Sequence, residues 1–336
     1  MKIPAAGVNT IAVFRALQLG DLLCSIPAFR VLRHAYPAAK ISLIGLPGMK
    51  GLAKRFGHYI DEFIEFPGYP GLPEQPYDPV RFDCFLKAMK DRKFDLLLQM
   101  QGNGSVVNDM LQSFEPEYLA GFCEMTDERQ PLLLQYPAHG HESLRHLALM
   151  RHLDACSDHA MPPELLDDSA LEFPIYQEDI LEFEKMEMPL RPGKYICLHP
   201  GSRGSWRQWP PSHFAAIGDY CAKLGYDIVV TGTAAEADLA LEVASMMKSV
   251  PLVCAGKTTL GAMAVMLERA HGLISNCTGV SHIAAALEKQ SVVISMDGEP
   301  DRWGPLNQLL HRTVDWTRHQ DYGAVLKEVN ALFFKL

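Results

Sequence analysis

The sequence has little positive charge for its size. It contains 31 lysines and arginines against 40 aspartates and glutamates over 336 residues, a formal net charge of −9. A surface whose main task is to bind nucleic acid has the opposite balance, so this charge argues against nucleic acid as a partner. A net charge does not describe a single pocket, and a local basic site for phosphate groups is compatible with it.

Cysteine patterns that hold metals or form disulfide frameworks are also missing. The cysteines are scattered, and no two of them form a C-x-x-C pair or another ligand-like spacing. This distribution predicts reduced thiols and neither a zinc site nor a disulfide framework. The eight positions are Cys24, Cys84, Cys123, Cys156, Cys197, Cys221, Cys254 and Cys277.

Long apolar runs are absent as well. No stretch approaches the roughly 18 apolar residues that a membrane-spanning helix needs. The segment Met1–Thr10 lacks the basic start and the apolar run of a signal peptide. We therefore expect a cytoplasmic protein, and peripheral contact with a membrane stays open.

What the sequence does contain is an ordinary globular composition, with 48% hydrophobic and 21% charged residues, and a length comfortable for two domains. The apolar run Ile11–Phe14 predicts a strand, Leu22–Arg33 an amphipathic helix with an expected kink at Pro27, and Lys40–Gly45 a second strand. A strand, a helix and a strand in close succession form a βαβ unit and therefore a parallel sheet.

The alternation continues along the chain. Strands are predicted at 63–66 and 95–99, with a helix at 79–92 between them. The pattern weakens over 115–172, where a predicted helix at 141–153 has a basic, histidine-rich face. We interpret that face as solvated, and the alternative is a surface that meets an anionic acceptor.

A second α/β series begins at the strand predicted for 195–199. Further strands are predicted at 226–231, 252–254, 273–275 and 292–295, with helices between them. The two series predict an α/β protein of two doubly wound, Rossmann-like domains with an inter-domain cleft at the carboxyl ends of the sheets. We expect a first domain at 1–175, an acidic linker at 176–193, a second domain at 194–318 and a C-terminal helix at 319–336.

The stretch Ala270–Leu287 is a candidate anion-binding loop. Leu273–Ser275 predicts a buried strand, Thr278 and Gly279 a turn, and the residues from Val280 onward a helix. Free N–H groups and the positive end of the helix dipole suit an anion, and a glycine lets a phosphate approach the backbone. Taken alone, the stretch is better interpreted as an ordinary strand-to-helix turn.

A second loop strengthens the case for a binding site. The segment Pro200–Arg203 follows a predicted strand and supplies small residues and a guanidinium. Arg207 stands just before a helix predicted to open at Trp209. Two arginines and a helix N-terminus are what a diphosphate group needs.

Three segments in order carry a resemblance to a known family. Phe14–Arg33 is similar to R-x-x-x-x-G-D-x-x-x-x-x-P-x-x-x-x-L-R, and His199–Ser202 followed by Arg207–Pro210 is similar to H-P-G…[KR]-x-W-P. Ser275–Ala286 is similar to S-N-D-T-G-x-x-H-x-A-A-A. On these motifs the chain resembles glycosyltransferase family 9, the ADP-heptose:lipopolysaccharide heptosyltransferases with the GT-B architecture.

The resemblance implies an inverting transfer from a nucleotide-diphospho-sugar, ADP-linked in this family, to a lipopolysaccharide-type or other glycoconjugate acceptor. It implies no metal and no organic cofactor, and a cytoplasmic protein for which peripheral contact with the inner membrane stays open. Asp21 matches the carboxylate proposed as general base. Without the resemblance, Asp21 is equally well explained as a helix N-cap.

The remaining roles are also implied by the resemblance. Arg207 matches the basic residue on the donor phosphates, and its alternative is a surface arginine stacked on a neighbouring tryptophan. Thr278 and Gly279 match the loop that cradles the diphosphate. His282 and Glu236 match the family histidine and the nucleoside contact; taken alone, they are a packing residue and an exposed helix-start acid. The implied donor-binding set is Ser202, Arg203, Arg207, Glu236, Cys277, Thr278, Gly279 and His282.

Cys277 departs from the family pattern, which has an aspartate there in N-D-T-G. A neutral thiol cannot bind sugar hydroxyls as a carboxylate does. Our order of explanations is an altered donor, reduced activity, and a thiolate stabilised by the helix N-terminus. Two competing functions are a catalytically weakened GT-B relative that binds a nucleotide or glycan as a partner protein, and an isomerase of the nucleotide-sugar epimerase type.

Overall fold

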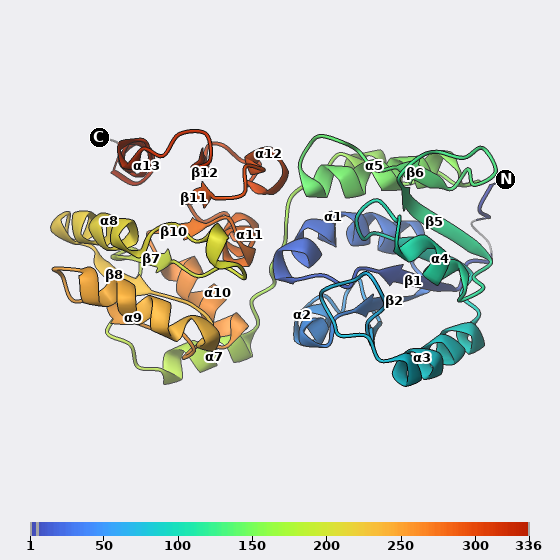
Figure 1. Ribbon diagram of the computed structural model, residues 1–336, viewed down its shortest axis with the longest axis horizontal. Coiled ribbons are helices and arrows are strands. Elements are labelled where there is room, and N and C mark those ends of the chain that lie inside the picture. Colours follow the sequence, from blue (N-terminus) through green and yellow to red (C-terminus); the bar gives the residue numbers. More distant parts are fainter. Residues whose placement is uncertain (1, 5–6, 335–336) are drawn as a thin grey trace. The chain divides into compact units, whose positions relative to one another are not determined.

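The computed structural model describes residues 2–4 and 7–334. The predicted ranges that begin at residue 1 and end at residue 336 therefore extend beyond the described residues. The chain divides into two compact units, Met1–Ala170 and Leu171–Leu336 (Figure 1). Within the described residues, each unit contains one parallel sheet of six strands with helices around it.

The first unit follows the alternation that the sequence predicts. Its strands are β1 (Thr10–Phe14), β2 (Lys40–Gly45), β3 (Glu62–Glu65), β4 (Leu96–Gln99), β5 (Tyr118–Cys123) and β6 (Leu133–Gln135). Its helices are α1 (Leu19–Ala35), α2 (Lys50–Arg55), α3 (Pro79–Arg92), α4 (Val107–Gln112), α5 (Glu142–Ala155) and α6 (Pro163–Leu166), with the 3-10 turn η1 (Pro47–Met49).

The second unit repeats the arrangement. Its strands are β7 (Tyr195–His199), β8 (Asp227–Val230), β9 (Leu252–Val253), β10 (Gly272–Asn276), β11 (Ser291–Ser295) and β12 (His311–Asp315). Its helices are α7 (Gln177–Lys185), α8 (Pro211–Lys223), α9 (Ala237–Met246), α10 (Leu260–Arg269), α11 (Gly279–Ala286), α12 (Pro300–Trp303) and α13 (Tyr322–Val329). The short turns are η2 (Ser205–Arg207), η3 (Ala234–Glu236) and a π-helical turn (Asn330–Phe334).

The strand order confirms the predicted fold class. The first sheet runs β3-β2-β1-β4-β5-β6, and the second runs β12-β11-β10-β7-β8-β9. Counted from β7, the second order is the same as the first, and it is the order of the Rossmann fold. In each sheet the side on which successive strands are added changes once, between β1 and β4 and between β7 and β10. These are the two switch points at which open α/β sheets bind ligands.

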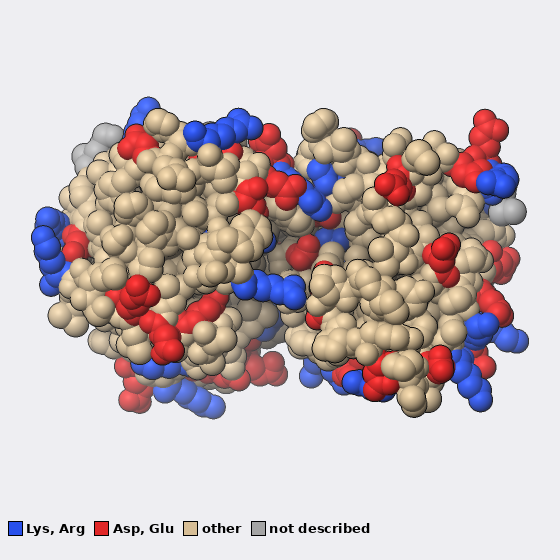
Figure 2. Space-filling model, in the orientation of Figure 1, with Lys and Arg blue, Asp and Glu red and all other residues tan. Residues whose placement is uncertain are grey.

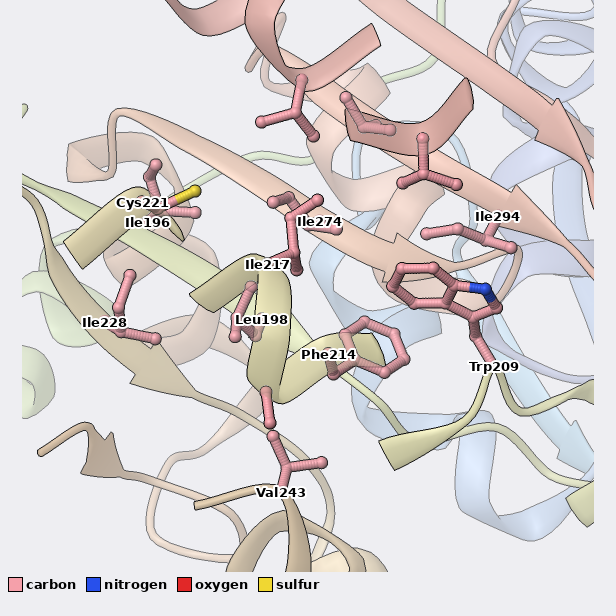
Figure 3. Close-up of a cluster of buried hydrophobic side chains, with 14 of the residues drawn as sticks. Ile196, Leu198, Trp209, Phe214, Ile217, Cys221, Ile228, Val243, Ile274 and Ile294 are labelled. Atoms are coloured by element: carbon pink, nitrogen blue, oxygen red, sulfur yellow. The ribbon is translucent and has the colours of Figure 1, made fainter. Parts of the chain in front are cut away.

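The core of the second unit lies between its sheet and helix α8. Figure 3 shows Phe214, Ile217 and Cys221 of α8 over the strand residues Ile196 and Leu198. Trp209 is fully buried at the edge of this cluster, and its ring lies 5.1 Å from that of Phe214. The buried tryptophan fixes the residues just before α8 against the sheet.

Several elements were not predicted. Strands β5, β6 and β12 were not predicted; β6 and β12 are the edge strands of their sheets, and β5 lies next to β6. The expected linker at 176–193 contains helix α7, which belongs to the second unit and packs on α10. Thr259 donates to Glu182 across these helices at 2.6 Å, and Arg269 lies 5.2 Å from the ring centre of Phe183.

The segment expected as a separate C-terminal helix joins the core of the second unit. Val325 and Val329 of α13 and Leu332 and Phe333 of the π-helical turn are buried in the same cluster as α8. On the face shown in Figure 2, basic and acidic side chains are interspersed over the surface of each unit. In the described residues, no helix is long and apolar enough to cross a membrane.

Candidate functional site

The predicted site residues lie at the two switch points. Asp21 follows β1 in the first unit, and the loops that begin at Pro200 and Cys277 follow β7 and β10 in the second. Since the carboxyl ends of neighbouring parallel strands meet at one edge, these loops converge within each sheet. The candidate residues therefore form two groups, one in each unit.

Asp21 lies in the first turn of α1. Its Oδ2 accepts a hydrogen bond from the backbone N–H of Gln18 at 3.2 Å, and its Oδ1 lies 3.7 Å from the Arg15 guanidinium. The side chain is 22% exposed. The interpretation of Asp21 as N-cap is wrong, because α1 begins at Leu19 and Gln18 occupies the N-cap. A partly exposed carboxylate at a switch point remains available for chemistry.

Arg15 is a buried residue that the sequence reasoning did not assign. Its Nε donates to the backbone oxygen of Asp21 at 2.7 Å, Nη1 donates to the backbone oxygen of Met100, and Nη2 lies 3.4 Å from Glu142. Glu142 also accepts from the Tyr136 hydroxyl at 2.8 Å. A buried guanidinium requires such partners, since an unpaired buried charge is strongly destabilising. Arg15 is the first residue of the opening motif R-x-x-x-x-G-D, and this position was the sequence signal that could have identified it.

The first part of the polar face of α5 is buried, which corrects the interpretation of a solvated helix face there, whereas Arg151 further along the same face is exposed. His141, Arg145 and His146 are all buried, and Arg145 pairs with Glu142 at 3.6 Å. Burial lowers the pKa of both histidines to about 4, and for His146 the charge of Arg15 contributes to this lowering. Glu142, which lies 3.4 Å from the buried Arg15, belongs to this buried part of the helix. Both rings are therefore neutral at neutral pH.

Asn276 connects the loops of the second switch point. Its Nδ2 donates to the backbone oxygens of Pro200 and Gly201 at 2.7 and 3.3 Å, and its Oδ1 accepts from the N–H of Trp209 at 2.9 Å. The loop from 200 to 209 is thus tied to the end of β10. Ser202 lies inside this loop, buried, with its carbonyl oxygen bonded to a glutamine amide, and Arg203 is exposed.

Arg207 forms an ion pair that the sequence did not reveal. Its Nη2 contacts a carboxylate oxygen of Asp297, which follows β11, and its guanidinium carbon lies 5.5 Å from the ring centre of Trp206. The alternative of a surface arginine stacked on tryptophan is therefore correct for the contact with Trp206, but it omits the ion pair with Asp297. The Arg207 side chain is 30% exposed, so part of it remains free to meet a ligand.

Glu236 closes the neighbouring loop. Its Oε2 accepts from the backbone N–H and the hydroxyl of Thr233 at 2.7 and 2.9 Å. The carboxyl group also lies against Gly201, where an added Cβ would stand 2.2 Å from it. Glu236 does stand at a helix start, as the N-cap of α9, but it is not exposed, because its carboxylate is partly buried between the loops that follow β7 and β8.

The loop after β10 forms the predicted strand, turn and helix. Thr278 occupies the N-cap of α11, Gly279 begins the helix, and His282 is buried with its ring 6.3 Å from that of Trp303. Cys277 is also buried, which raises the pKa of its thiol to about 12. The thiolate explanation for Cys277 is therefore wrong, because burial outweighs any help from the helix N-terminus.

In the described residues, no three histidine, cysteine, aspartate or glutamate side chains are grouped so that they could hold a metal ion. The chemistry that the two groups offer is that of a carboxylate base, arginine charges and backbone amides. A helix N-terminus and an arginine beside it suit a phosphate-bearing ligand.

Comparison with known proteins decides the family. Residues 84–321 match the family model described as Glycosyltransferase family 9 (heptosyltransferase). This span is more than half of the chain. The chain belongs to glycosyltransferase family 9. The family that the three motifs predicted is thereby confirmed.

Individual relatives of this family 9 chain are distant. Lipopolysaccharide heptosyltransferase 2 of Salmonella typhimurium is 26% identical over 117 residues, and the match spans 33% of this chain and 34% of that relative. The chain thus matches about a third of the length of this curated relative.

Two solved structures extend over nearly the whole chain. The family 9 glycosyl transferase from Veillonella parvula has a TM-score of 0.74 at 19% identity, covering 100% of this chain and 99% of that one. The ADP-heptose lps heptosyltransferase II of E. coli has a TM-score of 0.71 at 20% identity, covering 97% and 99%. At these identities the likeness establishes the fold.

The buried histidines predict a pH-dependent stability. A histidine that is neutral when folded and titrates at its ordinary pKa of about 6.5 when unfolded costs stability as the pH falls below that value. For His146 the loss extends from about 6.5 down to its folded pKa of about 4. The slope per histidine approaches about 1.4 kcal/mol per pH unit within this window. We expect His146→Phe to flatten the slope.

The measurement is denaturant unfolding at a series of pH values across that window. The matched control is His319→Phe, since the His319 side chain is 80% exposed. Equal slopes for wild type and His146→Phe would contradict the assignment of His146 as a neutral buried group.

Proposed function

We propose that this family 9 protein is an inverting glycosyltransferase. It moves a sugar, heptose or a related one, from a nucleotide-diphospho-sugar, ADP-linked, to a lipopolysaccharide-type or other glycoconjugate acceptor, without a metal or organic cofactor. The observation that carries the proposal is the second switch point, where Arg207 and the N-terminus of α11 stand at the ends of neighbouring strands. Relatives described as heptosyltransferases, one with ADP-heptose in its description, support the choice of donor.

In this proposal the second unit binds the donor. The first-turn amides of α11, with Thr278 and Gly279, face the diphosphate, and Arg207 stabilises the charge that develops on the departing diphosphate. Glu236 contacts the nucleoside from the adjacent loop, and His282 supports the start of α11. Ser202 and Arg203 complete the donor-binding loop.

In the first unit, Asp21 acts as general base. It takes the proton of the acceptor hydroxyl that attacks the anomeric carbon, and the bond to the diphosphate breaks. The Arg15 guanidinium, 3.7 Å from Oδ1, stands beside this carboxylate. The family match begins at residue 84, so the role of Asp21 rests on the opening motif and on its place at the switch point.

The alternative function is a catalytically weakened relative that binds a nucleotide or glycan as a partner protein. The neutral thiol of Cys277, where the family motif has a carboxylate, is the observation that favours it. Release of nucleoside diphosphate from a sugar donor, measured with and without acceptor, separates the two functions.

The donor is identified by thermal unfolding with ADP-, GDP-, UDP- and dTDP-sugars. A ligand that binds only the folded protein stabilises it by about 2.7 kcal/mol at a hundredfold excess over its dissociation constant. We expect an ADP-sugar to give the largest shift. ADP release is then measured with a series of lipopolysaccharides truncated at successive core sugars. Binding without release supports the partner protein.

Asp21→Asn tests the general base. Positioned acid–base groups contribute roughly a hundredfold or more to the rate. We expect acceptor-dependent turnover to fall by about that factor, while donor affinity stays near the wild-type value. The control is Asp91→Asn, an exposed aspartate in α3. Turnover equal to that of the wild type would leave Asp21 with a purely structural role.

Arg207→Ala tests the phosphate contact. The loss of a charge-assisted hydrogen bond costs about 1.5–3 kcal/mol, which weakens binding roughly ten- to hundredfold. We expect this loss for ADP and not for adenosine, by calorimetric titration. Arg318→Ala is the control, since that side chain is 78% exposed. Equal losses for ADP and adenosine would place Arg207 away from the phosphates.

A further inference from the structure

Asp297 is a buried carboxylate that none of the roles above uses. It follows β11, and its side chain is 6% exposed. Its Oδ1 accepts from the Ser295 hydroxyl at 2.8 Å and from the N–H of Glu299 at 3.2 Å, while its Oδ2 contacts the Arg207 guanidinium. Burial by itself would raise the pKa of this carboxyl, but the hydrogen bond from Ser295 and the charge of Arg207 outweigh it and hold the pKa below its ordinary value. The group is ionised.

Cys277 belongs to the same cluster. Its backbone N–H donates to the oxygen of Ile294 at 2.8 Å, which sets the end of β10 beside the end of β11. The charges of Asp297 and Arg207 both act on the Cys277 thiol, the first raising its pKa and the second lowering it. Arg207, Cys277 and Asp297 form the arginine cluster, in which the thiol is neutral and Asp297 is the acidic partner of the arginine.

We propose that Asp297 is a positioning residue, which holds the Arg207 guanidinium beside the loop that begins α11. The inference rests on the proposed function. The arginine cluster thus has its one carboxylate at position 297 and a neutral thiol at position 277.

The physical reason is the difference between charge and placement. A free arginine side chain has many rotamers, and a fixed acidic partner removes much of that freedom in advance. Attraction between arginine and a diphosphate needs only the charge, whereas stabilisation of the leaving oxygen needs the guanidinium in one place. Loss of Asp297 therefore affects turnover more than donor binding.

The positions 277 and 297 are also predicted to be coupled. An aspartate added at 277 beside an intact Asp297 sets two carboxylates against one guanidinium, and like charges at close range oppose each other's ionisation. The same aspartate in a protein without the Asp297 charge would restore a single pair. Cys277→Asp should thus impair turnover when Asp297 is present and improve turnover when Asp297 is replaced by Asn.

The experiment compares wild type, Asp297→Asn, Cys277→Asp and the double variant. The readout is ADP release from ADP-heptose, with the truncated lipopolysaccharide on which the wild type is most active. We expect Asp297→Asn to lower kcat tenfold or more with KM for the donor unchanged or lower. Cys277→Asp alone should raise KM, and the double variant should recover at least a third of the wild-type kcat.

Matched controls isolate the charge. Asp301→Asn removes an exposed carboxylate from the neighbouring helix α12, and Cys277→Asn with Asp297→Asn adds a polar group of similar size without charge. Neither should reproduce the effect. If Asp297→Asn fails to fold by thermal unfolding, Ser295→Ala retains the carboxylate, removes one of its donors and should show the same split to a smaller degree.

Three results would overturn the inference. They are a wild-type kcat in Asp297→Asn, an equal effect of Cys277→Asp in both backgrounds, and, where Ser295→Ala replaces Asp297→Asn, an unchanged kcat in Ser295→Ala. In each case the wild type remains active and the proposed function stands. A wild type that releases no nucleoside diphosphate from any donor of the panel overturns the proposed function, and the inference with it.

Discussion

Buried polar side chains hold the loops at the switch point of each sheet. At a switch point, the loops after two neighbouring parallel strands lead to opposite faces of the sheet. Their buried backbone groups have no strand partner there, so they must form hydrogen bonds with other groups. In the first unit Arg15 binds the backbone oxygens of Met100 and Asp21. In the second, Asn276 binds three backbone groups of the loop from 200 to 209.

These side chains place the candidate site as well as satisfying the backbone. Asn276 fixes the loop that carries Arg207, and Arg15 stands beside the carboxylate of Asp21. Groups held in this way need little reorganisation when charge develops on a reacting ligand, which is the most effective form of electrostatic stabilisation. The structural demand of the switch point and the chemical demand of the site are met by the same contacts.

The two switch points differ in how they treat buried charge. At the first, Glu142 pairs with both Arg15 and Arg145. Burial keeps His141 and His146 neutral beside them. Removing one member of such a network leaves another charge unpaired, at about 3–5 kcal/mol. The second leaves Arg207 partly exposed, with Asp297 behind it. The buried charges of the first group are thus held by one another, while Asp21 in the first group and Arg207 in the second are both partly exposed.

The sequence by itself determined the class of fold, the parallel strands and the places of Asp21, Thr278 and Gly279. Short apolar runs, helical periodicity and turn residues are local signals, and a parallel βαβ unit puts each loop at a strand's carboxyl end. Only the tertiary structure decided the partners. Arg15 pairs with Glu142 across 127 positions, and Arg207 with Asp297 across 90. Strand order brings such pairs together, and nothing in the local pattern encodes it.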